Sequence, residues 1–154
     1  MCKMFSEVYG LETVSLRYFN IYGERQNVGG AYAMVIGIFV DQLLNGKPMT
    51  IRGDGEQRRD FTYVGDVVNA NILASQSENV GNGEVINIGN GDNRSINDIA
   101  DMIGGERLHR EPVIEPRETL ADNSLAEKLL GWKPTQNIED WVPGYKKEIG
   151  LDEV

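Results

Sequence analysis

Apolar residues recur along the chain at two spacings, and each spacing predicts a different kind of element. One set recurs every three or four positions and therefore shares one face of a helix predicted over residues 32–45: Met34, Val35, Ile38, Phe39 and Leu43. Residues 13–19 are instead rich in β-branched and aromatic side chains, which predicts a strand. A helix over residues 2–9, ended by Gly10, runs directly into this strand, and that succession favours an α/β fold.

Turn and capping residues delimit the next elements. Further strands are expected at three places: residues 50–52, 60–64 and 85–89. Asp66 is expected to cap the helix that follows the second of these strands. Ser95 and Asp98 have the spacing of a capping box, which predicts that a helix begins there and runs through Ile103.

The last third of the chain alternates polar loop with helix. Residues 106–118 are polar and contain two prolines, so we expect a loop with a short extended piece. Two more helices are predicted, over residues 124–130 and 137–149. Asp122 or Asn123 is expected to cap the first of them. Pro143 is expected to kink or interrupt the second, because proline lacks the N–H that a helix interior uses.

Composition and charge exclude several classes of protein. The 154 residues carry a net charge of −9 and are 40% hydrophobic, which indicates one compact folded unit and disfavours nonspecific nucleic-acid binding. No apolar run approaches the roughly 18 residues that a membrane span needs. The single Cys2 excludes an internal disulfide framework and a cysteine-based zinc site. We therefore predict a cytoplasmic protein that binds neither membrane nor nucleic acid.

Residues 17–26 form the first stretch with candidate chemistry. Asn20 follows the predicted strand 13–19, at the place where open α/β sheets bind ligands, and its amide suits a phosphate or hydroxyl. Asn20 is also a common turn former, so a purely structural role is the competing interpretation.

Residues 52–61 form the second such stretch, because two glycines precede the adjacent pair Arg58 and Arg59. Arginine binds phosphate through a planar fork of donors. Adjacent residues of a strand point to opposite faces, so only one of the two can face a given ligand. A solvated turn is the competing interpretation. The net charge of −9 does not decide between them, since charges beyond about 8 Å are largely screened.

Other candidate sites have weaker support. His109 is the only histidine, and it lies in a polar loop without an evident catalytic partner. The turn at residues 89–91 lacks the glycine spacing that holds a dinucleotide pyrophosphate. Acidic residues are scattered and no histidine pair exists, so no metal site is predicted.

Several segments resemble the extended short-chain dehydrogenases of the NAD-dependent epimerase/dehydratase family, in the order in which that family has them. The matching motifs are LRYFNIYG (16–23), GDGEQRRDFTYV (53–64), VINIG (85–89), SIND (95–98), LADNS (120–124) and LLGWKP (129–134). The segment GAYAMVI (30–36) resembles UDP-sugar 4-epimerases of the UDP-glucose and UDP-N-acetylglucosamine type.

The resemblance implies an α/β fold that is the C-terminal, substrate-binding portion of an extended Rossmann-type enzyme, with small strands and several helices. Residues 1–23 are then the end of the catalytic helix and a strand of the Rossmann domain, and residues 1–154 together are the substrate-binding half. Family members bind NAD and invert C4 of a UDP-sugar through a 4-keto intermediate. No tyrosine here is followed four residues later by lysine, so we expect no catalytic residue in this chain and NAD held mainly by a missing N-terminal half.

The resemblance also implies residue roles near the cofactor and the diphosphate. Tyr18 and Phe19 correspond to the nicotinamide side of the site. Asn20 corresponds to an amide that holds the UDP diphosphate, and Arg59 to the arginine that binds it. Gln26 is expected to approach the sugar.

Roles on the uridine side follow from the same resemblance. Met34 and Val35 correspond to the helix start that meets the uridine. Thr50, Ile51 and Arg52 correspond to the strand that flanks the uracil. Arg52 departs from the family, which has an aromatic or amide residue there.

A second departure concerns residues 109–117. The family has an arginine and an acid there that grip phosphate and ribose. Glu115 corresponds to the acid, whereas the arginine is missing or replaced by Arg110 or Arg117.

Two other functions remain open. One is a nucleotide-sugar dehydratase or decarboxylase of the same superfamily. The other is a non-catalytic module for nucleotide-sugar binding or assembly. The apolar strand 13–19, if exposed, is a template for pairing with another chain, so we also predict a homo-oligomer.

Overall fold

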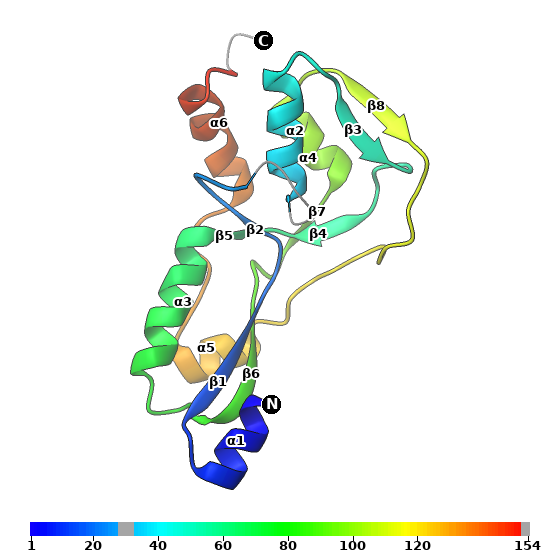
Figure 1. The fold of residues 1–154 in the computed structure, drawn as a ribbon. Helices are drawn as coiled ribbons and strands as arrows, with labels where there is room; N and C mark the ends of the chain where they lie inside the picture. The colour runs from blue at the N-terminus through cyan, green and yellow to red at the C-terminus, as the bar shows by residue number, and fades with distance from the viewer. Residues whose placement is uncertain (28–32, 152–154) are drawn as a thin grey trace.

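Within the computed structural model, which describes residues 1–27 and 33–151, the chain forms six helices and eight short strands (Figure 1). The helices are α1 (Cys2–Tyr9), α2 (Val35–Leu44), α3 (Val64–Gln76), α4 (Ile96–Ile103), α5 (Ser124–Leu130) and α6 (Ile138–Glu148). The strands are β1 (Thr13–Tyr18), β2 (Ile21–Tyr22), β3 (Met49–Arg52), β4 (Arg58–Asp60), β5 (Thr62–Tyr63), β6 (Asn82–Ile88), β7 (Asn93–Ser95) and β8 (Arg107–Arg110).

The strands pair two by two, and most of the pairs are parallel. β1 pairs with β6, β2 with β5 and β3 with β8 in parallel, whereas β4 and β7 are antiparallel. Parallel pairs need connections that cross over, and helices supply them here. This mixture of helices and parallel strands confirms the predicted α/β class.

The core has two parts, one at each end of the molecule. Figure 1 shows α2 and α4 beside β3 at one end, with α6 on the other side of these two helices, and α3 and α5 near β1 and β6 toward the other end. The first part is built on Phe39, Met49, Ile51, Ile99 and Trp141, all buried. The second is built on Ala70, Ile86, Ile88, Ala126 and Trp132. The short strands β2, β4, β5 and β7 lie between the two parts (Figure 1).

Local signals that depend on few residues are confirmed. α1 ends at Gly10, whose φ of 67° is the left-handed conformation expected of a glycine stop. The capping box is present, since Ser95 accepts from the Asp98 N–H and Asp98 accepts from the Ser95 N–H. β1 and β3 agree with the predicted strands to within one residue.

The predicted role of Asp66 is wrong. α3 begins at Val64, three residues earlier than expected, so Asp66 falls inside the first turn. Its buried carboxylate instead accepts from the Thr135 N–H at 3.0 Å, the Thr135 hydroxyl at 2.7 Å and the Gln136 N–H at 3.2 Å. Asp66 therefore fixes the position of Thr135 and Gln136, just before α6, through contacts that no local sequence pattern reveals.

Three other details of the helices differ from expectation: one start, one cap and one interior. α2 starts at Val35, and the predicted start at Tyr32 lies outside the described residues. Asn123 occupies the N-cap position of α5 without a capping bond, while the Asp122 carboxylate accepts from the Ser124 N–H at 3.0 Å. α6 is not interrupted at Pro143, because the buried side chains next to it hold the helix against the core at the cost of one hydrogen bond.

Candidate functional site

A cleft of about 440 Å³ opens between the start of α2, the end of β3 and the segment around residue 115. Its polar lining consists of Asn20, Thr50, Arg52, Gln57, Arg59 and Glu115. Its apolar lining consists mainly of Met34, Val35, Ile38, Phe39, Phe61 and Ile96. An apolar floor with a few convergent polar groups is the usual composition of a small-molecule site.

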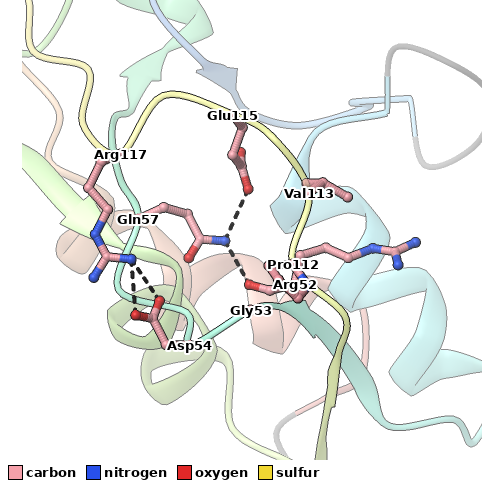
Figure 2. A pocket seen from close by; sticks show the side chains of 8 residues that line it. All are labelled: Arg52, Gly53, Asp54, Gln57, Pro112, Val113, Glu115 and Arg117. Atoms are coloured by element: carbon pink, nitrogen blue, oxygen red, sulfur yellow. Dashed lines mark hydrogen bonds and ion pairs between the residues drawn. The ribbon is translucent and has the colours of Figure 1, made fainter.

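A second hollow of about 320 Å³ adjoins the cleft and shares Arg52, Gln57, Val113 and Glu115 with it. Figure 2 shows Arg117 reaching Asp54 at its far side. The Arg117 guanidinium donates to both carboxylate oxygens of Asp54, at 2.8 and 3.0 Å. This guanidinium also holds the pKa of the Asp54 carboxyl below its usual range. Arg117 is therefore committed to an ion pair at the surface.

Arg59 faces the cleft, while its neighbour Arg58 points to the other side, as expected for adjacent strand residues. One Arg59 amino group pairs with Glu115, and the other donates to the Arg58 carbonyl at 2.8 Å. Only 12% of the Arg59 side chain is exposed. The guanidinium is thus held in one orientation at the wall of the cleft.

Gln57 links the two walls of the cleft. Its buried side-chain amide donates to the Arg52 carbonyl at 3.1 Å and to Glu115 Oε1 at 3.3 Å (Figure 2). Sequence reasoning did not select this residue. The signal that could have found it is its place in the glycine-rich motif two residues before Arg59.

Asn20 is held at the cleft by a chain of contacts through Asp60. The Asn20 amide donates to the Asp60 carbonyl at 3.0 Å. The Asp60 carboxylate, fully buried, accepts from three main-chain N–H groups: those of Asn90 at 2.6 Å, Gly91 at 3.0 Å and Ala121 at 3.0 Å. Asp60 therefore joins three distant segments behind the cleft and sets the position of Asn20.

The first turn of α2 borders the cleft and has no side-chain cap. Met34 occupies the N-cap position with extended backbone and makes no capping bond, and both Met34 and Val35 line the cleft. N–H groups at the start of a helix carry partial positive charge. This wall therefore favours a negative group in the cleft.

The structure brings most of the predicted substrate residues to one place. Seven of them line the cleft: Asn20, Met34, Val35, Thr50, Arg52, Arg59 and Glu115. Ile51 does not, because alternation along β3 turns its side chain into the core. Gln26 lines a separate hollow of about 250 Å³ beside Tyr22 and Glu24.

Apart from Met34 and Val35, sequence reasoning missed the apolar members of the cleft. Phe39, Phe61 and Ile96 were expected only as parts of elements, yet they line it together with Ile38 and Val113. The helical spacing of Ile38 and Phe39 predicts a shared face, but not what that face meets.

The described residues do not form a dinucleotide site on their own. Tyr18 is exposed and its hydroxyl donates to Asn71 Oδ1 at 2.9 Å, while the Phe19 N–H donates to the Ile88 carbonyl at 3.0 Å. Neither residue lines the cleft or the hollow beside it. A dinucleotide needs a crevice with a glycine-rich turn at a helix start, so the described residues do not fit the whole of NAD.

Metal and membrane chemistry receive no support from the part of the chain that the structure describes. Within residues 1–27 and 33–151, no three His, Cys, Asp or Glu side chains gather as a metal site would require. No helix in these same ranges is both long enough and apolar enough to cross a bilayer.

Comparison with known proteins shows the family that this chain resembles. The model of the NAD dependent epimerase/dehydratase family matches residues 1–89. A putative UDP-glucose 4-epimerase of Methanocaldococcus jannaschii is 42% identical over 147 residues, which are 91% of this chain and 46% of that protein. A UDP-N-acetyl-alpha-D-glucosaminuronate decarboxylase of Bacillus cytotoxicus is 44% identical over 110 residues, 67% of this chain and 33% of that protein.

Solved structures agree with the sequence relatives. The UDP-glucuronic acid 4-epimerase of Bacillus cereus, in complex with UDP-glucuronic acid and NAD, superimposes with a TM-score of 0.86 at 35% identity. The match covers 97% of this chain and 49% of that one. The chain thus spans about half the length of the relatives that it matches.

Proposed function

Because the chain belongs to the NAD-dependent epimerase/dehydratase family, we propose that its cleft binds the UDP portion of a UDP-sugar whose C4 is inverted with NAD as the hydride carrier. The family match and the relatives named above support this proposal. The observation that carries it is the convergence of Asn20, Arg59 and Glu115 with an apolar floor in one cleft. No tyrosine of these 154 residues is followed four residues later by lysine, so the proposal assigns this chain substrate binding and no catalytic acid or base.

Each wall of the cleft suits a different part of the ligand. The guanidinium of Arg59, whose side chain is largely but not fully buried, offers a planar fork of donors to the diphosphate, and Asn20 offers an amide to the same group. Met34 and Val35 offer apolar contact to the uridine beside a helix start that favours anions. Glu115 is then the acceptor for the ribose hydroxyls.

The remaining roles in the proposal concern residues outside the cleft. Tyr18 and Phe19, at the end of β1, face the nicotinamide when the other half of the enzyme is present. Gln26 approaches the sugar from its neighbouring hollow. Residues 1–23 then form the end of the catalytic helix and one strand of the Rossmann domain, while residues 1–154 together form the substrate-binding half.

A second candidate is a nucleotide-sugar decarboxylase or dehydratase, which the 44% identical relative from Bacillus cytotoxicus favours. It shares the UDP cleft and differs in the groups that act on the sugar. With this chain joined to an NAD-binding half, turnover of UDP-glucuronic acid with release of CO₂ would select a decarboxylase, and loss of water from a UDP-sugar would select a dehydratase. A non-catalytic binding module is the third candidate, and UDP binding without any turnover in the joined protein would select that one.

Calorimetry with UDP tests the proposed binding. We expect saturable heat with the unmodified chain and at least tenfold weaker binding with Arg59→Lys, because a lysine keeps the charge but loses the fork of donors. Arg110→Lys is the matched control, since Arg110 lies on β8 and lines neither the cleft nor its neighbouring hollow. Absence of heat with the unmodified chain at millimolar UDP would refute the proposal.

We also propose that the chain associates with a second copy. Among the described residues β1 pairs with β6 alone, so one of its edges presents unpaired main-chain groups. Light scattering at micromolar concentration is expected to give twice the monomer mass of 17.2 kDa. A monomer under those conditions contradicts this proposal and leaves the UDP proposal untouched.

A further inference from the structure

The arginines around the cleft differ in whether their charge is already compensated. Arg59 pairs with Glu115, and Arg117 makes two hydrogen bonds to Asp54. Arg58 bonds to Asn93 at 2.7 and 2.8 Å and lies 3.6 Å from Asp98. An anion that approaches any of these three must compete with groups already in place.

Arg52 is different. In residues 1–27 and 33–151 no hydrogen bond or ion pair involves its side chain, although it lines both the cleft and the hollow beside it. Its backbone is fixed, because its carbonyl accepts from the Gln57 amide at 3.1 Å. Figure 2 shows its guanidinium extended away from Arg117 and Glu115. Arg52 therefore adds an uncompensated positive charge to the cleft.

The register of β3 explains why Arg52 lies there. Thr50 exchanges two hydrogen bonds with Gln42 of α2, at 2.7 and 2.9 Å, so this face of the strand lies against the helix. Arg52 is two residues further along and on the same face, about 7 Å away. Since β3 runs back along α2, Arg52 lies toward the early turns of the helix, where Val35 and Ile38 line the same cleft.

We propose that Arg52 is the second phosphate-binding arginine of the cleft, so that the ligand's diphosphate is bound by both Arg59 and Arg52. Arg52 then supplies the phosphate contact for which the family uses an arginine in the segment that corresponds to residues 109–117, a contact that neither Arg110 nor the paired Arg117 provides from the cleft wall. It requires no ion pair to be broken, and its planar fork fits a phosphate. The inference rests on the proposed function and deepens it, because it makes the second phosphate a requirement for tight binding.

The test compares UDP with UMP, which lacks the second phosphate. Calorimetry at fixed ionic strength uses the unmodified chain, Arg52→Gln and the matched controls Arg110→Gln and Arg117→Gln. We expect Arg52→Gln to weaken UDP binding by roughly ten- to a hundredfold and UMP binding by less than about threefold, because one charge-assisted contact is lost. The controls are expected to stay within about twofold of the unmodified chain.

Arg52→Lys refines the test, because lysine keeps the positive charge but lacks the planar fork of N–H donors. Its affinity for UDP is expected to lie between those of the unmodified chain and Arg52→Gln. Equal losses for UDP and UMP, no loss in Arg52→Gln, or a larger loss in Arg117→Gln would each overturn the inference. If Arg59→Lys weakens UDP binding and Arg52→Gln does not, the inference fails while the proposed function stands. If the unmodified chain binds no UDP, both fail.

Discussion

Arg59 and Glu115 are 56 residues apart in the sequence, yet the guanidinium of one is paired with the carboxylate of the other inside the cleft. Glu115 also accepts from Gln57, so its carboxylate is held from two sides. The Glu115 carboxylate occupies Arg59 N–H donors that a phosphate would use. A ligand that binds through Arg59 must therefore exchange with an internal carboxylate.

The exchange predicts an unusual effect of Glu115→Gln. Removing the negative charge leaves Arg59 available, so inorganic pyrophosphate is expected to bind about three- to tenfold more tightly than to the unmodified chain. UDP is expected to gain less, because the proposed contact of Glu115 with the ribose weakens at the same time. Calorimetry with both ligands measures the two effects. Weaker pyrophosphate binding in the variant would contradict the exchange.

Asp60→Asn is expected to destabilise the fold. The Asp60 carboxylate is fully buried and accepts from the N–H groups of Asn90, Gly91 and Ala121. In asparagine an NH₂ group replaces one carboxylate oxygen, so a hydrogen-bond donor would face main-chain N–H donors. We expect the free energy of unfolding to fall by about 3 kcal/mol. Urea denaturation measures the loss. The matched control is Asp101→Asn, at an exposed ion pair with Arg107, where a change below about 1 kcal/mol is expected.

The two substitutions Gly89→Ala and Gly144→Ala are expected to act in opposite directions. A Cβ on Gly89 would lie 2.3 Å from the Ala121 Cβ and 2.9 Å from an Asp60 carboxylate oxygen, so we expect a loss of about 1–3 kcal/mol. Gly144 lies in α6 with no atom within 4 Å of such a Cβ, so alanine there is expected to stabilise the fold by about 0.5–1 kcal/mol. Thermal unfolding of both variants checks the pair. Equal changes would show that the close approach at Gly89 is absent in solution.

The contacts of the Glu24 carboxylate predict that part of the free energy of unfolding depends on pH. The indole N–H of Trp141 donates to its carboxylate at 2.8 Å and, with the Tyr63 hydroxyl at 3.1 Å, holds the pKa of Glu24 below its ordinary value. Because the pKa is lower in the folded than in the unfolded chain, ionised Glu24 stabilises the fold above the ordinary glutamate pKa of about 4.3. This contribution is lost as the pH falls through the folded-state pKa.

Glu24→Gln is therefore expected to be less stable than the unmodified chain at pH 7, with the difference shrinking as the pH falls below about 4. Urea midpoints measured between pH 7 and about pH 3 follow the effect. Glu78→Gln, at an exposed position, is the control and is expected to leave the urea midpoint at pH 7 nearly unchanged. A difference that stays constant or grows in acid would contradict the assigned sign.

The sequence alone was informative wherever the deciding residues lie within a few positions of one another. The capping box at Ser95, the glycine stop of α1 and the alternation of Arg58 and Arg59 depend on helix and strand geometry that is set locally. The ordered motifs also predicted the family and half of the residues that line the cleft. Pattern and motif therefore reached the α/β class and the neighbourhood of the site.

Tertiary structure decided which of these residues have partners. The carboxylate of Asp66 is a tether for residues 69 and 70 positions away rather than a cap, and Glu115 compensates Arg59 across 56 positions. The same packing commits Arg117 to Asp54 and leaves Arg52 unpaired, a distinction that their identical chemistry conceals. Periodicity determines which face of an element a residue occupies. Which charge meets that face depends on how distant segments pack together.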